Sequence, residues 1–202
     1  MVQAVLSSIV NLVILVAIPG GIYAWVQWFR HKRSLADMCQ RLGLELGDRR
    51  YLLGCAGLSI LIVLVLVLAP IPLEPLTRKG SAMAQFAGLG FSGQTLFRAM
   101  LYGMVQTGFC EEFFFRGMIA GSLGRKLSVL WANVWQAVIF LLPHLLILFF
   151  APEAWGLLVL VLVVGLFKGW VRIKAQSIWG PWMVHAAGNV TICVVVAMRT
   201  MA

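Results

Sequence analysis

The sequence predicts an all-α polytopic membrane protein with about six transmembrane helices and an active site inside the helical bundle. Of its 202 residues, 61% are hydrophobic and only 11% are charged, whereas charged residues approach a quarter of an ordinary soluble domain. The mean hydropathy is +0.94, and apolar stretches recur at lengths near the ~20 residues that a spanning helix needs. The expected spans are 4–28, 52–69, 99–122, 129–150, 155–167 and 178–198.

The first two expected spans carry no signature of function. The span 4–28 is apolar from its start, like a signal peptide, but it lacks a basic n-region and exceeds the ~7–15 residues of an h-region, so we expect it to be retained. The second span ends at Pro70, Pro72 and Pro75. The connection that follows, 70–98, is the longest in the chain. We expect it to lie in the membrane interface or to form a re-entrant segment, because irregular backbone cannot face lipid.

The third expected span contains the adjacent carboxylates Glu111 and Glu112, which are the only two of the seven acidic residues inside an apolar span. A charged side chain at the centre of a spanning helix costs about 2.5–3.5 kcal/mol on insertion scales. The presence of two adjacent carboxylates in this span therefore needs a structural or functional explanation. Glu112 precedes Arg116 by four residues, the favourable orientation for a helical ion pair. Glu111 is turned about 100° from Glu112, so the two carboxylates cannot both face Arg116. Small residues of this span should let a neighbouring helix approach closely; they are Gly103, Gly108, Gly117 and Gly121.

The remaining spans add two histidines. Phe140 and His144 lie four residues apart in the fourth span, and His185 and Asn189 have the same spacing in the sixth, so each pair projects from one helix face. At 1.5 Å per residue from the basic ends of the helices, Glu111 lies about 15 Å deep and His185 about 10 Å, but His144 lies about 22 Å deep. Either the fourth helix begins in the cytoplasm, outside the membrane, or Pro143 bends it. The fifth expected span, 155–167, is short.

The net charge of +9 follows the expected topology and does not indicate a nucleic-acid partner. Eleven of the sixteen basic residues fall in alternate loops, and the positive-inside bias places those loops in the cytoplasm and both termini outside, as in a bacterial inner membrane. The eleven are Arg30, Lys32, Arg33, Arg41, Arg49, Arg50, Arg125, Lys126, Lys168, Arg172 and Lys174. Arg78, Lys79, Arg98 and Arg199 lie on the opposite side, and Arg116 lies within a span.

We expect a single transmembrane domain over 1–202, with a catalytic core at about 99–196 and two N-terminal helices at about 4–28 and 52–69. The four cysteines form no Cys-x-x-Cys pair and no disulfide framework. Cys110, beside Glu111, is a candidate nucleophile, but a buried thiol in apolar surroundings is more often an inert filler.

The spacing suggests that the two carboxylates have different roles. Glu112 pairs with Arg116 and stays ionised, whereas Glu111 points into the bundle toward the histidines. Burial without a charged partner favours the neutral form of a carboxylate, which makes it basic enough to accept a proton from water. His185 and Asn189 then stabilise the oxyanion that forms when a carbonyl is attacked.

Each polar residue also has a purely structural interpretation. A single intramembrane histidine or asparagine more often forms an interhelical hydrogen bond, and a Glu–Arg pair can simply neutralise itself. The joint occurrence of two Glu, an Arg, two His and an Asn on three spans otherwise almost free of ionisable groups favours function.

At these residues the chain resembles the CAAX-protease and bacteriocin-processing family of intramembrane proteases, also called the abortive-infection family, which includes the Ras-converting enzyme. The family pattern Glu-Glu-x-x-x-Arg, Phe-x-x-x-His and His-x-x-x-Asn occurs here in order within 99–196. The three motifs begin at Glu111, Phe140 and His185.

The resemblance implies that Glu111 activates water with His144, while His185 and Asn189 stabilise the oxyanion and Glu112, Arg116 and Phe140 support the site. It favours a glutamate mechanism without a cofactor. The alternative is zinc or another divalent metal held by Glu111, His144 and His185 with one open position.

The leading hypothesis is therefore an intramembrane endopeptidase that cleaves a membrane-anchored or lipidated protein or peptide near its C-terminus. Two alternatives stay open. One is a small transporter or proton relay, since Glu and His inside spans also mark proton pathways. The other is a binding protein of the bacteriocin-immunity type, in which the polar cluster only holds the bundle together.

Overall fold

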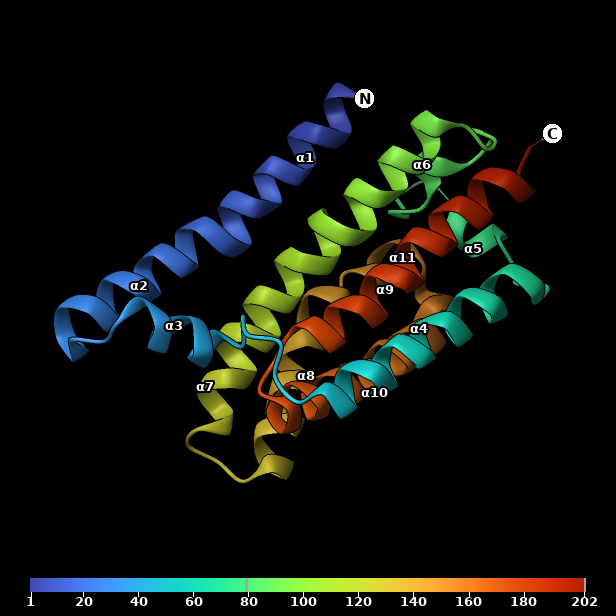
Figure 1. Cartoon of the computed structure of the whole chain (residues 1–202). Coiled ribbons are helices and arrows are strands. Elements are labelled where there is room, and N and C mark those ends of the chain that lie inside the picture. The colour runs from blue at the N-terminus through green and yellow to red at the C-terminus, as the bar shows by residue number, and fades with distance from the viewer. Residues whose placement is uncertain (79, 202) are drawn as a thin grey trace.

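The computed structural model describes residues 1–78 and 80–201, and these residues form helices and connections without any β-strand (Figure 1). Lys79, counted above on the outer side, lies outside the described residues. The elements are α1 (Val2–Leu12), η1 (Val13–Ala17), α2 (Ile18–His31), α3 (Leu35–Leu42), α4 (Arg49–Leu68), α5 (Glu74–Thr77), η2 (Ala84–Phe86), α6 (Gly93–Met100), η3 (Leu101–Phe109), η4 (Glu112–Ala120), α7 (Gly121–Gly124), α8 (Val129–His144), α9 (Ile147–Phe150), η5 (Pro152–Ala154), α10 (Trp155–Ala175) and α11 (Trp179–Arg199).

Five helical stretches of the described chain are long and apolar enough to cross a membrane: Val2–His31, Arg49–Leu68, Val129–Phe149, Trp155–Ala175 and Trp179–Arg199. They overlap the first, second, fourth, fifth and sixth expected spans. The third expected span lies in one further run of helical backbone that joins α6, η3, η4 and α7, which we call the long third helix. The expected all-α membrane fold with about six helices is confirmed.

The two chain ends lie at the same end of the bundle, and α3 and α7 lie at the other (Figure 1). The connections around α3 and after α7, which carry Lys32, Arg33, Arg125 and Lys126, gather at the α3 and α7 end. Backbone hydrogen bonds tie them together there: Ile178 N–H donates to the Gly43 carbonyl at 2.9 Å, and Asp48 N–H donates to the Ala175 carbonyl at 3.1 Å. This end is therefore one connected layer of loops.

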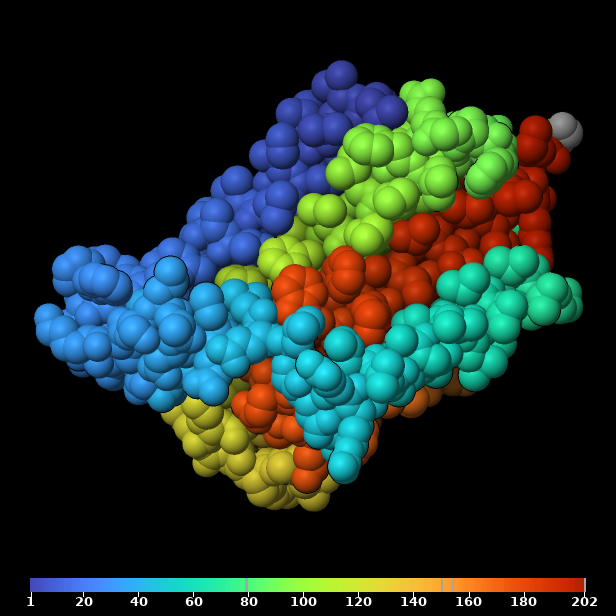
Figure 2. Space-filling model, viewed as in Figure 1, coloured from blue at the N-terminus to red at the C-terminus, as the bar shows by residue number. Residues whose placement is uncertain are grey.

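The last helix, α11, is central to the bundle. It packs against α4 on one side and against α6 and η3 on the other, while α10 packs against α8, and η4 contacts both. Figure 2 shows α11 lying between the long third helix and α4 on the visible face. Gly103 allows the long third helix to lie close to α11, because a Cβ there would lie 2.7 Å from the Val190 backbone nitrogen. The expected role of Gly103 in close helix packing is confirmed.

The connection 70–98 closes one end of the core. Phe86 is only 1% exposed and packs with Ala99 and Val196, among others. Gly88 N–H donates to Thr200 Oγ1 at 2.8 Å, and Gly90 N–H donates to the Ala197 carbonyl at 3.1 Å. The segment is thus held on the C-terminal turns of α11. Its position relative to the membrane interface stays a prediction.

The fifth helix corrects the sequence-based boundaries. It continues to Ala175, beyond the expected end at residue 167, and carries Lys168, Arg172 and Lys174 with it. Lys168 and Arg172 are 2% and 1% exposed, so their assignment to a cytoplasmic loop is wrong, whereas Lys174 is exposed. The physical reason is that each buried cation finds a partner: Arg172 donates to the Arg41 carbonyl at 2.8 Å, and Lys168 lies against a carboxylate described below. A hydropathy profile alone assigns such charged residues to a loop, because it does not include their buried partners.

The fourth helix has the expected N-terminal boundary. Helix α8 begins at Val129, and a start of this helix in the cytoplasm stays a prediction. Pro143 lies in its last turn, and the helix ends at His144, before the short helix α9. Pro143 has no N–H to donate to the Ile139 carbonyl, so one backbone hydrogen bond is missing from this last turn.

Candidate active site

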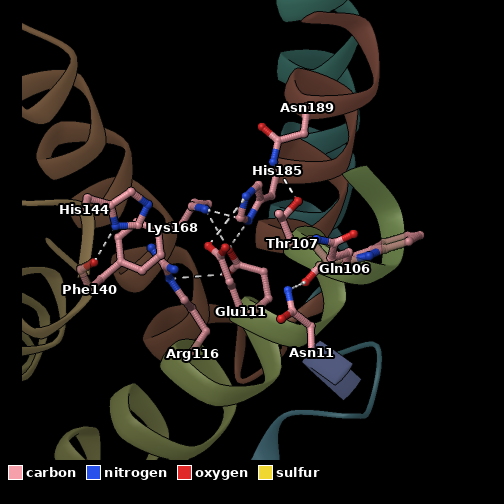
Figure 3. Close-up of polar contacts among 12 residues, drawn as sticks. Asn11, Gln106, Thr107, Glu111, Arg116, Phe140, His144, Lys168, His185 and Asn189 are labelled. Carbon is pink, nitrogen blue, oxygen red and sulfur yellow. Dashed lines mark hydrogen bonds and ion pairs between the residues drawn. The ribbon is translucent and has the colours of Figure 1, made fainter. Parts of the chain in front are cut away.

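Polar side chains from the long third helix, α10 and α11 converge inside the bundle (Figure 3). Glu112 is at the centre and is 0% exposed. Its Oε2 lies 3.2 Å from Arg116 Nε, and its Oε1 lies 2.6 Å from Lys168 Nζ and 2.8 Å from His185 Nδ1. The expected Glu112–Arg116 pair is present, and two further partners share the same carboxylate. The two cations beside this buried carboxylate, Arg116 and Lys168, stabilise its ionised form.

Glu111 has a different environment. Its side chain is 20% exposed, and Oε2 lies 3.9 Å from His185 Nε2. Within the described residues, Glu111 forms no other ion pair and its carboxylate receives no hydrogen bond. The two adjacent carboxylates are therefore separated as their helical angle predicted: one is buried and paired, the other accessible and weakly held.

Lys168 is the functional candidate that the sequence-based reasoning missed. Its ammonium group lies 2.6 Å from Glu112 Oε1, 3.0 Å from His185 Nδ1 and 5.0 Å from the centre of the Phe140 ring. One signal could have revealed it. An expected span of 155–167 is too short to cross a bilayer, so the helix had to continue past residue 168.

Asn189 is oriented by a second hydrogen-bonded pair. Its Nδ2 donates to Thr107 Oγ1 at 2.8 Å, and the Thr107 hydroxyl donates to the Tyr102 carbonyl at 2.9 Å. Thr107 was not predicted, although it precedes Glu111 by four residues and so shares its helix face. One amide hydrogen of Asn189 stays available for another acceptor, because an amide nitrogen carries two.

His144 lies apart from this cluster. Its Nδ1 is 2.8 Å from the Phe140 carbonyl, and its ring centre is 4.7 Å from that of Phe140. Figure 3 shows Lys168 between His144 and His185. Among the described residues, no hydrogen bond joins His144 to Glu111. The structure thus brings His185 and Asn189 to the Glu111 side of the site but leaves His144 on the opposite wall.

Phe140 supports the site through its ring face. The Arg116 guanidinium carbon lies 3.9 Å from the ring centre, and the Nη atoms of Arg116 have no hydrogen-bond partner among the described residues. A cation over an aromatic face is stabilised by the ring quadrupole, most strongly when both groups are desolvated. The cation–π contact with Phe140 therefore stabilises the buried Arg116 guanidinium in place of hydrogen bonds to its Nη atoms.

The comparison with protein families agrees with this site. A model of the Rce1-like family, described as type II CAAX prenyl endopeptidase Rce1-like, matches residues 56–191, which include every residue of the site described above. The chain belongs to the Rce1-like family. No curated protein and no solved structure gives a significant match.

Membership of the Rce1-like family confirms the resemblance drawn from the three motifs. The family is a protease family, so the chain is a CAAX-type peptidase, and its candidate spans make it an integral membrane protein. This favours a peptidase over the transporter and immunity-protein hypotheses.

Two other sequence-based candidates in this Rce1-like site can be placed. Cys110 is 0% exposed, and no hydrogen bond joins its sulfur to a histidine among the described residues, which favours the filler interpretation. Within residues 1–78 and 80–201, no three His, Cys, Asp or Glu side chains are grouped closely enough to hold a metal ion. Glu111, His144 and His185 therefore do not form a ready ligand set in this conformation.

Proposed function

We propose that this Rce1-like protein is an intramembrane endopeptidase in which Glu111 activates the attacking water. The observation that carries the proposal is the contrast between the two carboxylates. Glu112 is fully buried and is shared by Arg116, Lys168 and His185, whereas Glu111 is 20% exposed and has only a 3.9 Å contact with His185. A general base needs an accessible lone pair, and of the two carboxylates Glu111 is the one that is partly exposed.

The proposed hydrolysis has two proton transfers. Glu111 takes a proton from water as the water oxygen attacks the scissile carbonyl carbon, and the carbonyl oxygen becomes an oxyanion. His185 and Asn189 donate hydrogen bonds to that oxyanion. The protonated Glu111 then gives its proton to the amide nitrogen as the C–N bond breaks, which leaves a new carboxyl terminus and a free amine.

His144 is the second basic group that the resemblance assigns to the reaction. Its contact with the Phe140 carbonyl requires that Nδ1–H donates, so Nε2 keeps its lone pair. That nitrogen is suited to orient the water or to share its proton. Catalytic hydrogen bonds often shorten only when substrate binds, so the separation of His144 from Glu111 is compatible with this role.

The substrate class follows from the family and from an apolar groove beside the site. We propose a prenylated or otherwise lipid-anchored protein that is cut near its C-terminus. A groove of about 390 Å³ is lined by aromatic and thioether side chains, including Met104, Phe109, Trp179 and Trp182. The lining side chains come from the long third helix and from α11, and these two helices also carry Glu111 and His185. We propose that the apolar chain of the substrate lies in this groove.

The assay uses purified protein in lipid nanodiscs and a farnesylated peptide that ends in Cys-aliphatic-aliphatic-X, with release of a C-terminal fragment measured by mass spectrometry. Glu111→Gln should lower kcat by about 10²- to 10⁴-fold, the usual contribution of a general base. Glu45→Gln, an exposed carboxylate in a loop, is the matched control and should retain full activity. Full processing by both Glu111→Gln and His144→Ala would show that the proposal is wrong.

The reaction is proposed to need no metal. Treatment with a chelator should leave the rate of fragment release unchanged, and elemental analysis should find no stoichiometric zinc. Loss of activity with the chelator and its return with added zinc would refute this part and favour zinc held by Glu111, His144 and His185 after a rearrangement.

A further inference from the structure

We propose that Lys168 is a positioning residue that keeps His185 in the tautomer with hydrogen on Nε2. The inference rests on the proposed function, because it assigns His185 a donor role toward the oxyanion. It concerns a residue that none of the three motifs contains. Two observations support it: the Lys168 ammonium lies between Glu112 and His185, and the Lys168 side chain is almost completely buried.

Three polar atoms form a tight triangle at this point. Lys168 Nζ lies 2.6 Å from Glu112 Oε1 and 3.0 Å from His185 Nδ1, and Nδ1 lies 2.8 Å from the same carboxylate oxygen. The hydrogen-bonding protons can be arranged in two ways. Either the ammonium donates to both Oε1 and Nδ1, or Nδ1 carries a hydrogen that it donates to Oε1.

The charge count favours a charged lysine and a neutral histidine. Arg116 and Lys168 supply two cations to the cluster, and Glu111 and Glu112 supply two anions. A protonated His185 would leave one uncompensated charge in a dry interior, which is costly. His185 therefore carries a single ring hydrogen, and the remaining question is which nitrogen holds it.

The acceptors available to the Lys168 ammonium indicate which ring nitrogen of His185 holds the hydrogen. Lys168 is 2% exposed, and a buried ammonium with three hydrogens requires acceptors. Among the described residues, its hydrogen-bond partners are Glu112 Oε1 and His185 Nδ1, with the Phe140 ring 5.0 Å away. A hydrogen on Nδ1 would remove the second acceptor and turn an N–H toward the ammonium 3.0 Å away. Nδ1 therefore accepts and Nε2 carries the hydrogen, and the ammonium lies between the Nδ1 lone pair and Oε1 and donates to both, which offsets their repulsion at 2.8 Å.

The tautomer decides what His185 presents to the substrate. With hydrogen on Nε2, the ring directs a donor to the side of Glu111, whose Oε2 is 3.9 Å from Nε2. That donor can bind the oxyanion. The other tautomer would direct a lone pair at both the carboxylate and the oxyanion, and repel them. Because the oxyanion exists only after attack, loss of Lys168 should lower kcat and leave KM nearly unchanged.

The test measures the tautomer directly. The chain has three histidines, so ¹⁵N-histidine labelling in nanodiscs gives few signals, and variants at His31 and His144 assign them. In the wild-type protein His185 should carry hydrogen on Nε2. Lys168→Met should move it to Nδ1, where it is donated to Glu112. Lys174→Met, an exposed lysine on the same helix, is the matched control and should leave the spectrum unchanged.

The kinetic readout is independent of the spectrum. Lys168→Met should lower kcat about 10- to 100-fold, as losing the group that orients a functional histidine does elsewhere, with KM nearly unchanged. Hydrogen on Nδ1 in the wild-type protein would overturn the inference even if Lys168→Met cannot be purified folded. An unchanged tautomer in folded Lys168→Met would overturn it as well. A tautomer shift in a protein that cleaves no peptide would support the positioning role while refuting the proposed function.

Discussion

Replacing Glu112 by Gln should damage stability, whereas replacing Glu111 by Gln should damage only activity. Glu112 is 0% exposed and its carboxylate lies 3.2 Å from Arg116 Nε and 2.6 Å from Lys168 Nζ. The amide of Gln has the same size but no charge. Glu112→Gln therefore leaves two buried cations without the anion that they share. In the described part of the chain, Glu111 forms no ion pair with either of them.

The expected magnitude follows from that geometry. Removing one partner of a buried ion pair costs about 3–5 kcal/mol, because the other charge stays desolvated. On the scale of globular proteins of 150–250 residues, this lowers Tm by about 6–20 °C. Glu111 is partly exposed and its one contact is 3.9 Å long, so Glu111→Gln should cost about 1 kcal/mol or less, a shift of about 4 °C at most.

The assay is thermal unfolding in detergent, followed by the fluorescence of the eight tryptophans. A double variant, Glu112→Gln with Lys168→Met, supplies the internal control, because it removes one of the two uncompensated cations. It should be more stable than Glu112→Gln alone. The reasoning is refuted if Glu112→Gln unfolds at the wild-type temperature, or if Glu111→Gln is the less stable of the two single variants.

Three further predictions address packing, the second polar pair and the topology. Gly103→Ala should destabilise the protein by about 1–3 kcal/mol, since its Cβ would lie 2.7 Å from the Val190 backbone. Gly57→Ala, inside α4 with open space around its Cβ, is the control and should leave stability unchanged or raise it by up to about 1 kcal/mol in the same unfolding assay. Thr107→Val removes the acceptor that orients Asn189 and should lower kcat by about tenfold at unchanged Tm; an unchanged kcat would show that Thr107 does not position the amide. A C-terminal alkaline phosphatase fusion should be active and a fusion in the 125–128 loop inactive, and the reverse pattern would contradict the cytoplasmic placement of the basic loops.

Much of the architecture could be predicted from local properties of the chain. Mean hydropathy and the length of apolar runs predict the spans, because both depend only on neighbours in sequence. Helical geometry likewise predicts that Glu112 pairs with Arg116 four residues on, and that Glu111 faces elsewhere. The three motifs with this spacing were enough to indicate the family that the comparison later matched.

The partners across helices were decided only by tertiary structure. Lys168 is remote in sequence from Glu112 and His185, and hydropathy placed it in a loop, because the cost of burying an ammonium depends on partners that lie 56 and 17 residues away. The separation of His144 from Glu111 and the support of Asn189 by Thr107 have the same origin. Spacing along one helix determines which side chains share a face; only the packing of several helices determines what that face meets.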